Sequence, residues 1–239
     1  MIPKKIHYCW CGGKPLPKLM KKCIKSWKSY CPNYEIIRWD ESNFDVNCHP
    51  FVKSAYEQHA WAFVSDYARL KIIYDNGGIY LDTDVELVRN LDSLLKHQCY
   101  IGIEQGIYRC ATGLGFGATK FNPVVQSMLK LYDELIYDES KKDEMACPYI
   151  NNIVFERLGY QYGDEIQILD GVTIYPEKYF DPISTVMVKN LFCDETYSIH
   201  HASASWFNGT GRLKRWIATT IGNERIIVMR KVLKKLRNK

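Results

Sequence analysis

The stretch Tyr80-Leu81-Asp82-Thr83-Asp84, directly after Asn76-Gly77-Gly78-Ile79, is the most informative part of this chain. It has the alternation typical of a β-strand, in which successive side chains point to opposite faces. Leu81 and Thr83 would then face a core, and the tyrosine and both aspartates would share the other face. The pattern predicts a strand that presents two carboxylates beside an aromatic ring.

Two carboxylates this close repel each other unless positive charge lies between them. Hard oxygen ligands suit Mg²⁺, Mn²⁺ or Ca²⁺, so Asp82 and Asp84 are candidate ligands of a divalent cation. An Asp-x-Asp pair alone occurs by chance in many chains. Its interpretation therefore depends on the residues around it.

The composition is ordinary for a soluble globular protein, with 239 residues of which 46% are hydrophobic and 25% charged. No stretch approaches the roughly 18–20 apolar residues of a membrane span, and the N-terminus lacks the apolar core of a signal peptide. Nine cysteines are scattered without a Cys-x-x-Cys pair, which favours free, reduced thiols. We expect a cytoplasmic protein.

Residues 225–239 are basic, with no acid after Glu224, and a helical spacing of apolar residues runs through Ile226, Met229, Leu233 and Leu236. Such a basic amphipathic helix could rest on an anionic membrane surface. A helix docked on the domain with solvated lysines is an equal alternative. Nucleic acid ranks lower, because the rest of the chain lacks a basic, aromatic-interleaved pattern. We therefore expect one domain, 1–224, followed by this helix.

The remaining periodicity predicts an α/β fold, because strands and helices alternate through the first half of the chain. Expected strands lie at 5–10, 34–39, 79–85 and 99–104, and expected helices at 18–30, 50–75 (as one helix or two), 123–135 and 149–158. Gly77 is expected to end the helix before the Asp-x-Asp segment. A glycine-spaced loop is expected at 113–117.

Ligands of open α/β sheets bind at the carboxyl ends of the strands, where Trp10, Asp40 and the Asp82/Asp84 pair would converge. An aromatic ring can stack on a base, a carboxylate can bind ribose hydroxyls, and a metal can offset pyrophosphate charge. Taken singly, Trp10 could as well be a core residue and Asp40 a helix N-cap. Together they indicate a site for a nucleoside diphosphate.

The helix before the Asp-x-Asp segment places Asp66 and Arg69 three residues apart, on one face. A surface salt bridge is the simplest interpretation. The neighbours are apolar and aromatic, however, so we expect the pair to be partly buried, where an arginine needs a partner. Arginine also suits phosphate recognition through its planar fork.

Three segments carry a resemblance to a known family: Phe63-Val64-Ser65-Asp66-Tyr67-Ala68-Arg69, then 74–84, and the opening residues 2–13. They resemble the glycosyltransferase sugar-binding region with the DXD motif (glycosyltransferase family 32), which includes yeast initiating mannosyltransferase-like and bacterial capsular enzymes. The match covers roughly residues 2–95, with a weaker echo near 200–206. It implies a GT-A fold, with a Rossmann-like, mainly parallel sheet flanked by helices.

Carried over residue by residue, the resemblance assigns Trp10 to base stacking. It assigns Asp66 and Arg69 to the donor sugar and phosphate, and Tyr80 to the neighbourhood of the nucleotide. In the closing loop, Ser205 and Trp206 would contact the nucleotide sugar.

The resemblance also implies a metal site, in which Asp84 is the more direct ligand and Asp82 acts partly through ribose or water. His201 would complete the metal shell, although the adjacent His200 is an open alternative. The expected cofactor is Mn²⁺ or Mg²⁺.

The expected function is that of a metal-dependent, retaining glycosyltransferase. It would move a hexose from a nucleotide sugar, with a UDP-sugar favoured and GDP-mannose possible, to a glycan or lipid-linked acceptor in capsular or surface polysaccharide synthesis. Attack from the front face is preferred, and Glu104 is a candidate nucleophile by position only. The alternatives are a metal-dependent nucleotidyltransferase or phosphodiesterase, and a non-catalytic sugar-binding module. No nucleic acid partner is expected, and a peripheral position at the inner membrane face fits residues 225–239.

Overall fold

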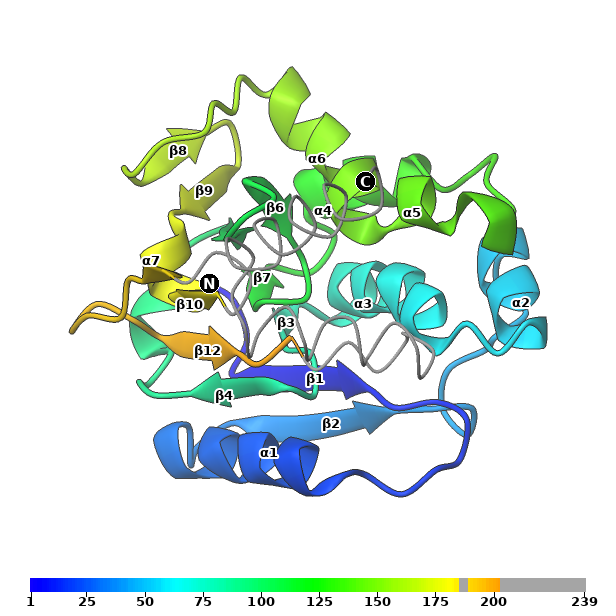
Figure 1. Ribbon diagram of the computed structural model, residues 1–239, viewed down its shortest axis with the longest axis horizontal. Helices are drawn as coiled ribbons and strands as arrows, with labels where there is room; N and C mark the ends of the chain where they lie inside the picture. Colours follow the sequence, from blue (N-terminus) through cyan, green and yellow to red (C-terminus); the bar gives the residue numbers. More distant parts are fainter. Residues whose placement is uncertain (185–188, 203–239) are drawn as a thin grey trace, which may run out of the picture.

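The computed structural model describes residues 1–184 and 189–202. Within them, one eight-stranded sheet has the order β2-β1-β3-β7-β5-β9-β8, with β6 paired to β5 (Figure 1). Its strands are β1 (Lys5–Cys9), β2 (Glu35–Trp39), β3 (Gly78–Tyr80), β5 (Cys99–Glu104), β6 (Arg109–Ala111), β7 (Phe116–Ala118), β8 (Gln167–Leu169) and β9 (Val172–Tyr175). Two short pairings lie outside it: β4 (Val85–Leu87) with β12 (Ser198–His200), and β10 (Ile183–Ser184) with β11 (Lys189–Asn190).

The helices cover both faces of the sheet. They are α1 (Lys18–Tyr30), α2 (Pro50–Glu57), α3 (Trp61–Asn76), α4 (Pro123–Lys130), α5 (Lys142–Met145), α6 (Cys147–Arg157) and α7 (Glu177–Phe180), with 3₁₀ turns η1 (Asp92–Leu94) and η2 (Glu139–Lys141). One apolar cluster gathers residues of α2, α3, α4 and α6, and a second gathers Trp27 of α1 with residues of β4 and α7. Figure 1 shows α1 below β1 and β2, and α3, α4 and α6 above them.

The sheet is mixed. Strands β1 and β2, β1 and β3, and β5 and β9 are parallel, whereas β7 pairs antiparallel with both β3 and β5. The α/β prediction is confirmed, and so are the two halves of the expected helix at 50–75, which form α2 and α3. The glycine-spaced loop expected at 113–117 is confirmed as far as residue 115, where the short strand β7 follows it.

The expected strand through the Asp-x-Asp segment is wrong in its second half. β3 ends at Tyr80, and the chain then turns, because the backbone N–H of Val85 donates to the carbonyl of Asp82 at 3.0 Å. Leu81 is buried as expected, but Thr83 is only half-buried and does not anchor a strand to the core. The expected helix at 123–135 ends five residues early, at Lys130, and the helix expected from 149 begins at Cys147.

A buried histidine fixes the start of β3. The ring of His7 accepts a hydrogen bond from the indole of Trp39 at 3.0 Å and donates one to the carbonyl of Gly77, also at 3.0 Å. Gly77, the expected end of α3, has φ of 65°, and a Cβ on Gly78 would lie 2.8 Å from the His7 ring. The two glycines are therefore required by backbone conformation and by this close approach.

Two further expectations can be compared with the described residues. All nine cysteines are free, as predicted. No helix in the described part of the chain is long and apolar enough to cross a membrane. The predicted helix at 225–239, and with it the division after residue 224, lies outside the described residues.

Candidate functional site

The turn after β3 separates the two aspartates. The backbone N–H of Asp82 donates to the carbonyl of Gly113 at 3.1 Å, which ties the turn to the chain between β6 and β7. The Asp82 carboxylate lies against α3 and accepts from the Tyr80 hydroxyl at 3.2 Å. The Asp84 carboxylate lies against β12 instead. Each carboxylate therefore belongs to a different set of contacts.

On the α3 side, the guanidinium of Arg69 joins two carboxylates. Its Nη2 lies 3.1 Å from Asp66 Oδ1 and 3.1 Å from Asp82 Oδ1. Its Nη1 donates to Thr112 Oγ1 at 3.4 Å and to Cys147 Sγ at 3.6 Å. We call these five residues the Arg69 cluster. The Arg69 side chain is only 4% exposed, so the expected partly buried pair with Asp66 is confirmed, and a second carboxylate shares it.

Burial dominates the electrostatics of the Arg69 cluster. Desolvation raises the pKa of Asp66 to about 6, although the neighbouring Arg69 opposes the shift. Desolvation also raises the pKa of Asp82, again against Arg69. Burial on its own would lower the pKa of Arg69, yet the two carboxylates and Tyr80 hold it well above its usual value. Arg69 therefore remains a fixed cation beside the turn.

Two residues that were not predicted as site residues complete the surroundings of Arg69. A Cβ on Gly113 would lie 2.2 Å from Asp82 Oδ2 and 3.1 Å from Arg69 Nη1, so a larger residue would displace the pair. Cys147, at the start of α6, donates its backbone N–H to Asp66 Oδ2 at 3.4 Å. The glycine spacing hinted at Gly113. The contact of Cys147 with Asp66 could not be predicted from the sequence, because the two residues lie 81 positions apart in the chain.

On the other side, β4 and β12 bring two histidines to the Asp-x-Asp turn. His200 Nε2 lies 3.5 Å from Asp84 Oδ1, whereas the ring of His201 lies 2.8 Å from Glu86 Oε2. Glu86 is also paired with Lys22 of α1 at 2.9 Å. We call the two pairs, Asp84 with His200 and Glu86 with His201, the β4–β12 ladder. Of the two histidines left open by the sequence, His200 is the one beside the Asp84 carboxylate.

The charge of His200 follows from its neighbours. Burial would lower its pKa, but the carboxylates of Asp84, Asp181 and Glu104 raise it to about 10. Glu104, which ends β5, therefore acts on the same ring as Asp84. The position of Glu104 is compatible with a role at the site, and its role as a nucleophile stays a prediction.

The oxygen donors of the turn suit a hard divalent cation. Among the described residues, no group of three or more His, Cys, Asp and Glu side chains is arranged to hold a metal ion. Mg²⁺ in particular keeps several waters and is often held by one or two carboxylates together with substrate phosphates. Asp82 and Asp84 fit that kind of partial site, which a diphosphate would complete.

The nucleotide end of the predicted site lies at the carboxyl ends of β1 and β2. Trp10 is half-buried and its indole N–H donates to the carbonyl of Lys14 at 2.6 Å. Asp40 accepts from the backbone N–H and the hydroxyl of Ser42 and pairs with Arg38, so its alternative as a helix N-cap is wrong: α2 begins ten residues later. Because β2, β1 and β3 are parallel neighbours, Trp10, Asp40 and the turn share one edge.

A second tryptophan lies at the same edge and was not predicted. Trp61 opens α3, and a Cβ on Gly12 would lie 2.7 Å from its ring, so the glycine near Trp10 lets the ring approach. Its ring also packs edge-on against Tyr56. The predicted contacts of Ser205 and Trp206 lie outside the described residues.

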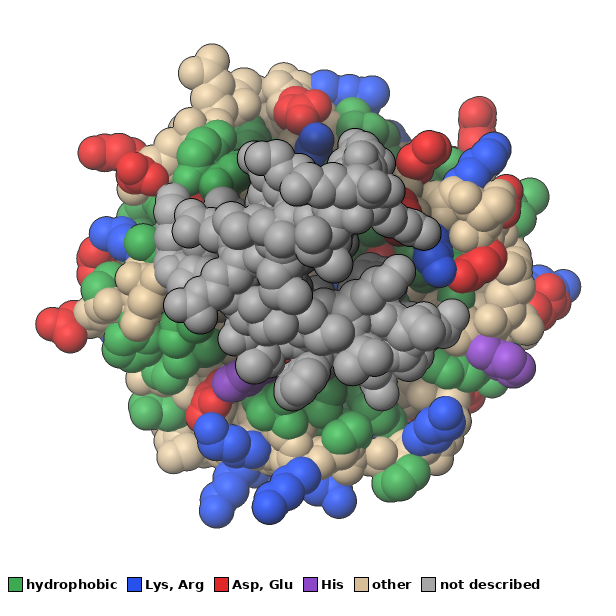
Figure 2. Space-filling model, viewed as in Figure 1, with side chains coloured by type: hydrophobic (Ala, Val, Ile, Leu, Met, Phe, Trp, Pro, Cys, Tyr) green, Lys and Arg blue, Asp and Glu red, His purple; other side chains and the backbone are tan. Residues whose placement is uncertain are grey.

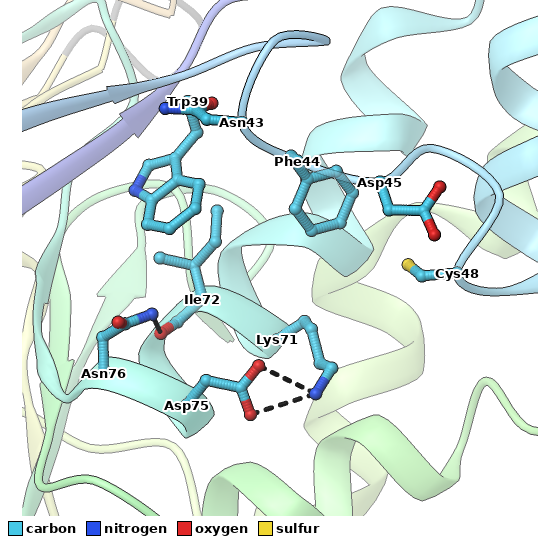
Figure 3. Close-up of a pocket in the computed structure, with 9 residues that line it drawn as sticks. All are labelled: Trp39, Asn43, Phe44, Asp45, Cys48, Lys71, Ile72, Asp75 and Asn76. Atoms are coloured by element: carbon cyan, nitrogen blue, oxygen red, sulfur yellow. Dashed lines mark hydrogen bonds and ion pairs between the residues drawn. The ribbon is translucent and has the colours of Figure 1, made fainter.

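One pocket of about 220 Å³ lies next to the end of β2, on the side of α3 (Figure 3). It opens between α3 and the segment after β2, and Figure 3 shows Trp39 and Phe44 on its walls and the Lys71–Asp75 ion pair at its base. None of the predicted site residues lines it. The pocket and the candidate site are therefore separate features.

Comparison with known proteins supports the assignment made from the motifs. Residues 17–101 match the family described as "Glycosyltransferase sugar-binding region containing DXD motif". Inositol phosphoceramide mannosyltransferase 3 of Schizosaccharomyces pombe is 33% identical over 125 residues, which cover 48% of this chain and 35% of the relative. Inositol phosphoceramide mannosyltransferase 2 of the same yeast is 22% identical over 235 residues, which cover 90% of this chain and 61% of the relative.

The chain thus spans less than two thirds of the length of either yeast relative. Among solved structures, PaToxG glycosyltransferase is similar with a TM-score of 0.52 and 20% identity, covering 65% of this chain and 69% of that one. At that identity the likeness concerns the fold. Residues 17–101 are therefore similar to the sugar-binding region of the DXD glycosyltransferases, and the fold is of the GT-A type.

Proposed function

We propose that this chain is a metal-dependent, retaining glycosyltransferase that moves a hexose from a nucleotide sugar to a glycan or lipid-linked oligosaccharide. The observation that carries the proposal is the Arg69 cluster beside the Asp82–Asp84 turn. It lies at the carboxyl ends of parallel strands, where open α/β sheets bind ligands. A fixed cation and two hard-ligand carboxylates at that position are the equipment needed to hold a diphosphate.

The residues of the turn have separate roles in this proposal. Asp82 and Asp84 would hold Mn²⁺ or Mg²⁺, which supplies positive charge against the leaving nucleoside diphosphate. Arg69 orients Asp82 through the 3.1 Å contact and adds a permanent positive charge beside it. Trp10 and Asp40 would bind the base and the ribose. The acceptor hydroxyl would attack from the front face, with a leaving-phosphate oxygen accepting its proton.

For the donor and the acceptor we propose only a chemical class. A UDP-hexose is favoured by analogy with the bacterial members of the family that the motifs resemble, and the names of the two yeast relatives support testing GDP-mannose beside it. Those names also specify a phosphorylated lipid as the acceptor of the relatives, which agrees with a lipid-linked acceptor here. We further propose a role in capsular or surface polysaccharide synthesis and a position at the cytoplasmic face of the membrane.

The test is donor hydrolysis or transfer in the presence of Mn²⁺. The chain is incubated with UDP- and GDP-sugars, and the released nucleoside diphosphate is assayed. We expect release from at least one donor, and Asp84→Ala to lower it by roughly 100-fold or more. Asp75→Ala, which changes an aspartate of the separate pocket, is the matched control and should leave release unchanged.

The other outcomes identify the competing functions. Release of a free nucleoside monophosphate would indicate a phosphodiesterase, and release of the sugar phosphate with the nucleotidyl group left on an acceptor would indicate a nucleotidyltransferase. Sugar binding without release from any donor would indicate a binding module. Where transfer occurs, NMR of the product decides the stereochemistry, and inversion at the anomeric carbon would exclude the retaining mechanism.

A further inference from the structure

Helix α1 and the loop before it concentrate positive charge. Residues 14–30 contain six lysines and no acid, a larger formal charge than the +5 of the whole chain. Figure 2 shows Lys and Arg side chains gathered along the lower edge of the molecule, over the position of α1 in Figure 1. This surface meets the candidate site at one point, where Lys22 pairs with Glu86.

The lysines of α1 form one stripe. They lie at positions 18, 21, 22, 25 and 28, spaced three and four residues apart, which places them on a single face of the helix. The opposite face buries Met20, Cys23 and Trp27 in the core. Lys18, Lys21, Lys22, Lys25 and Lys28 are all exposed. We call them the α1 lysine stripe.

The described residues neutralise little of the charge of the α1 lysine stripe. Within the described residues, Lys22 has an ion pair, with Glu86, and the other four lysines have none. The helix has no acid in its first turn, and the side chain of its N-cap residue, Pro17, makes no capping hydrogen bond. Like charges at these spacings weaken a helix, as does a cation near its N-terminus. The stability of α1 therefore depends mainly on its buried face.

Hydrogen bonds fix α1 to the strand that follows the Asp-x-Asp turn. The indole N–H of Trp27 donates to the carbonyl of Val85 at 2.7 Å, and the backbone N–H of Leu87 donates to the Ser26 hydroxyl at 2.9 Å. In the loop before the helix, Lys14 accepts the hydrogen bond from Trp10. A surface that binds α1 is therefore held in a constant orientation relative to the candidate site.

We propose that the α1 lysine stripe is a docking surface for an anionic phospholipid bilayer. A straight helix of 13 residues presents a line of charge roughly 20 Å long, which matches an extended charged plane better than a single phosphate group. All of its cations are lysines, which act as hydrated point charges and suit diffuse surface charge; bidentate recognition of one phosphate favours arginine. Juxtamembrane lysines of this kind bind anionic leaflets electrostatically.

The test compares two full-length variants with the same change in net charge. In the first, Lys18, Lys21, Lys25 and Lys28 are each replaced by Glu. In the control, four exposed lysines elsewhere are replaced by Glu: Lys53, Lys96, Lys130 and Lys141. Co-sedimentation is measured with vesicles of phosphatidylcholine alone and of phosphatidylcholine mixed with phosphatidylglycerol. We expect the stripe variant to bind the anionic vesicles about ten-fold or more weakly than the control variant, and binding of the unaltered chain to fall with added salt.

Equal binding by the two variants would overturn the proposal, because net charge alone would then explain the effect. So would loss of binding to a soluble DNA duplex in the stripe variant while its vesicle binding is unchanged. A variant with Gln at the same four positions shows whether α1 still folds, through its thermal unfolding, and it should also bind anionic vesicles less well than the unaltered chain. Since the readout is binding, the result is independent of the proposed sugar transfer.

Discussion

The two aspartates of the turn lie two residues apart and face two differently built regions. Asp82 belongs to the Arg69 cluster, where a 4% exposed guanidinium is held by groups from α3, the β6–β7 segment and α6. Asp84 belongs to the β4–β12 ladder, where its partner His200 arrives from a strand more than a hundred residues later in the chain. The first region holds one buried cation that Asp66 and Asp82 share, and the second joins the buried Asp84–His200 contact to the more exposed His201–Glu86 pair.

Because the two regions differ, substitutions in them should affect folding stability and activity to different degrees. Removing a group from the Arg69 cluster leaves buried charge without a partner, which is costly. Removing His201 from the β4–β12 ladder leaves Glu86 still paired with the exposed Lys22, which should cost little. We therefore expect stability to respond to changes around Asp82, and the proposed metal-dependent activity to respond most directly to changes around Asp84.

The largest effect is expected for Arg69→Ala. It leaves the carboxylates of Asp66 and Asp82 without their shared cation in a buried setting, and should destabilise the fold by about 3–5 kcal/mol. Urea unfolding followed by circular dichroism measures the change. Arg38→Ala removes a cation that is 42% exposed and pairs with Asp40, and should cost at most about 1 kcal/mol. Similar losses in both variants would show that the Arg69 cluster is not a buried charge network.

The buried histidine at the beginning of β3 differs from the Arg69 cluster, because the folded state holds its ring uncharged. Burial lowers the pKa of His7 to about 4 from 6.5, so the folded state favours the uncharged ring. The uncharged His7 ring contributes fully to the free energy of unfolding above pH 6.5. As the pH falls from 6.5 through 4, this contribution is lost, by about 3 kcal/mol in total. The measurement is the free energy of unfolding between pH 7 and pH 4. In His7→Gln the free energy of unfolding should change less between pH 7 and pH 4. An unchanged pH dependence in this variant would show that other groups cause it.

A smaller effect is expected for Gly113→Ala, which leaves every charge in place. The added Cβ would lie 2.2 Å from Asp82 Oδ2, so the carboxylate or the β6–β7 segment must shift, at a cost of about 1–3 kcal/mol. Gly163→Ala is the control, since nothing lies within 4 Å of the position that its Cβ would take, and it should be neutral. Comparable melting temperatures for the two variants would mean that the contact with Asp82 is easily relaxed.

The smallest stability effect is expected for the His201–Glu86 pair of the β4–β12 ladder. His201→Ala removes a ring that is 29% exposed and paired with Glu86, and should change stability by at most about 1 kcal/mol. His200→Ala should lower Mn²⁺-dependent nucleoside diphosphate release more than His201→Ala does, because His200 lies beside Asp84. The opposite order of activities would assign the metal-site role to His201.

Much of the first half of the fold could be predicted from local patterns. α1, β1, β2 and the end of α3 at Gly77 follow from helical spacing, strand alternation and the backbone freedom of glycine. The boundary of β3 could not be predicted, because alternation continues through Asp84 although the chain turns after Tyr80. The turn is stabilised by the hydrogen bond from Asp82 to Gly113, which is a tertiary contact.

The sequence by itself determined which chemical groups are present and their local order: the paired aspartates, the Asp66–Arg69 pair on one helix face, and the glycines that permit close approach. Those features depend on spacing within a few residues, which a sequence states directly. Only the tertiary structure decided that Arg69 is shared with Asp82, that Cys147 and Gly113 close around the Arg69 guanidinium, and that His200 reaches Asp84. These contacts join residues far apart in the chain, so they depend on how the sheet and its helices pack, and no local pattern encodes them.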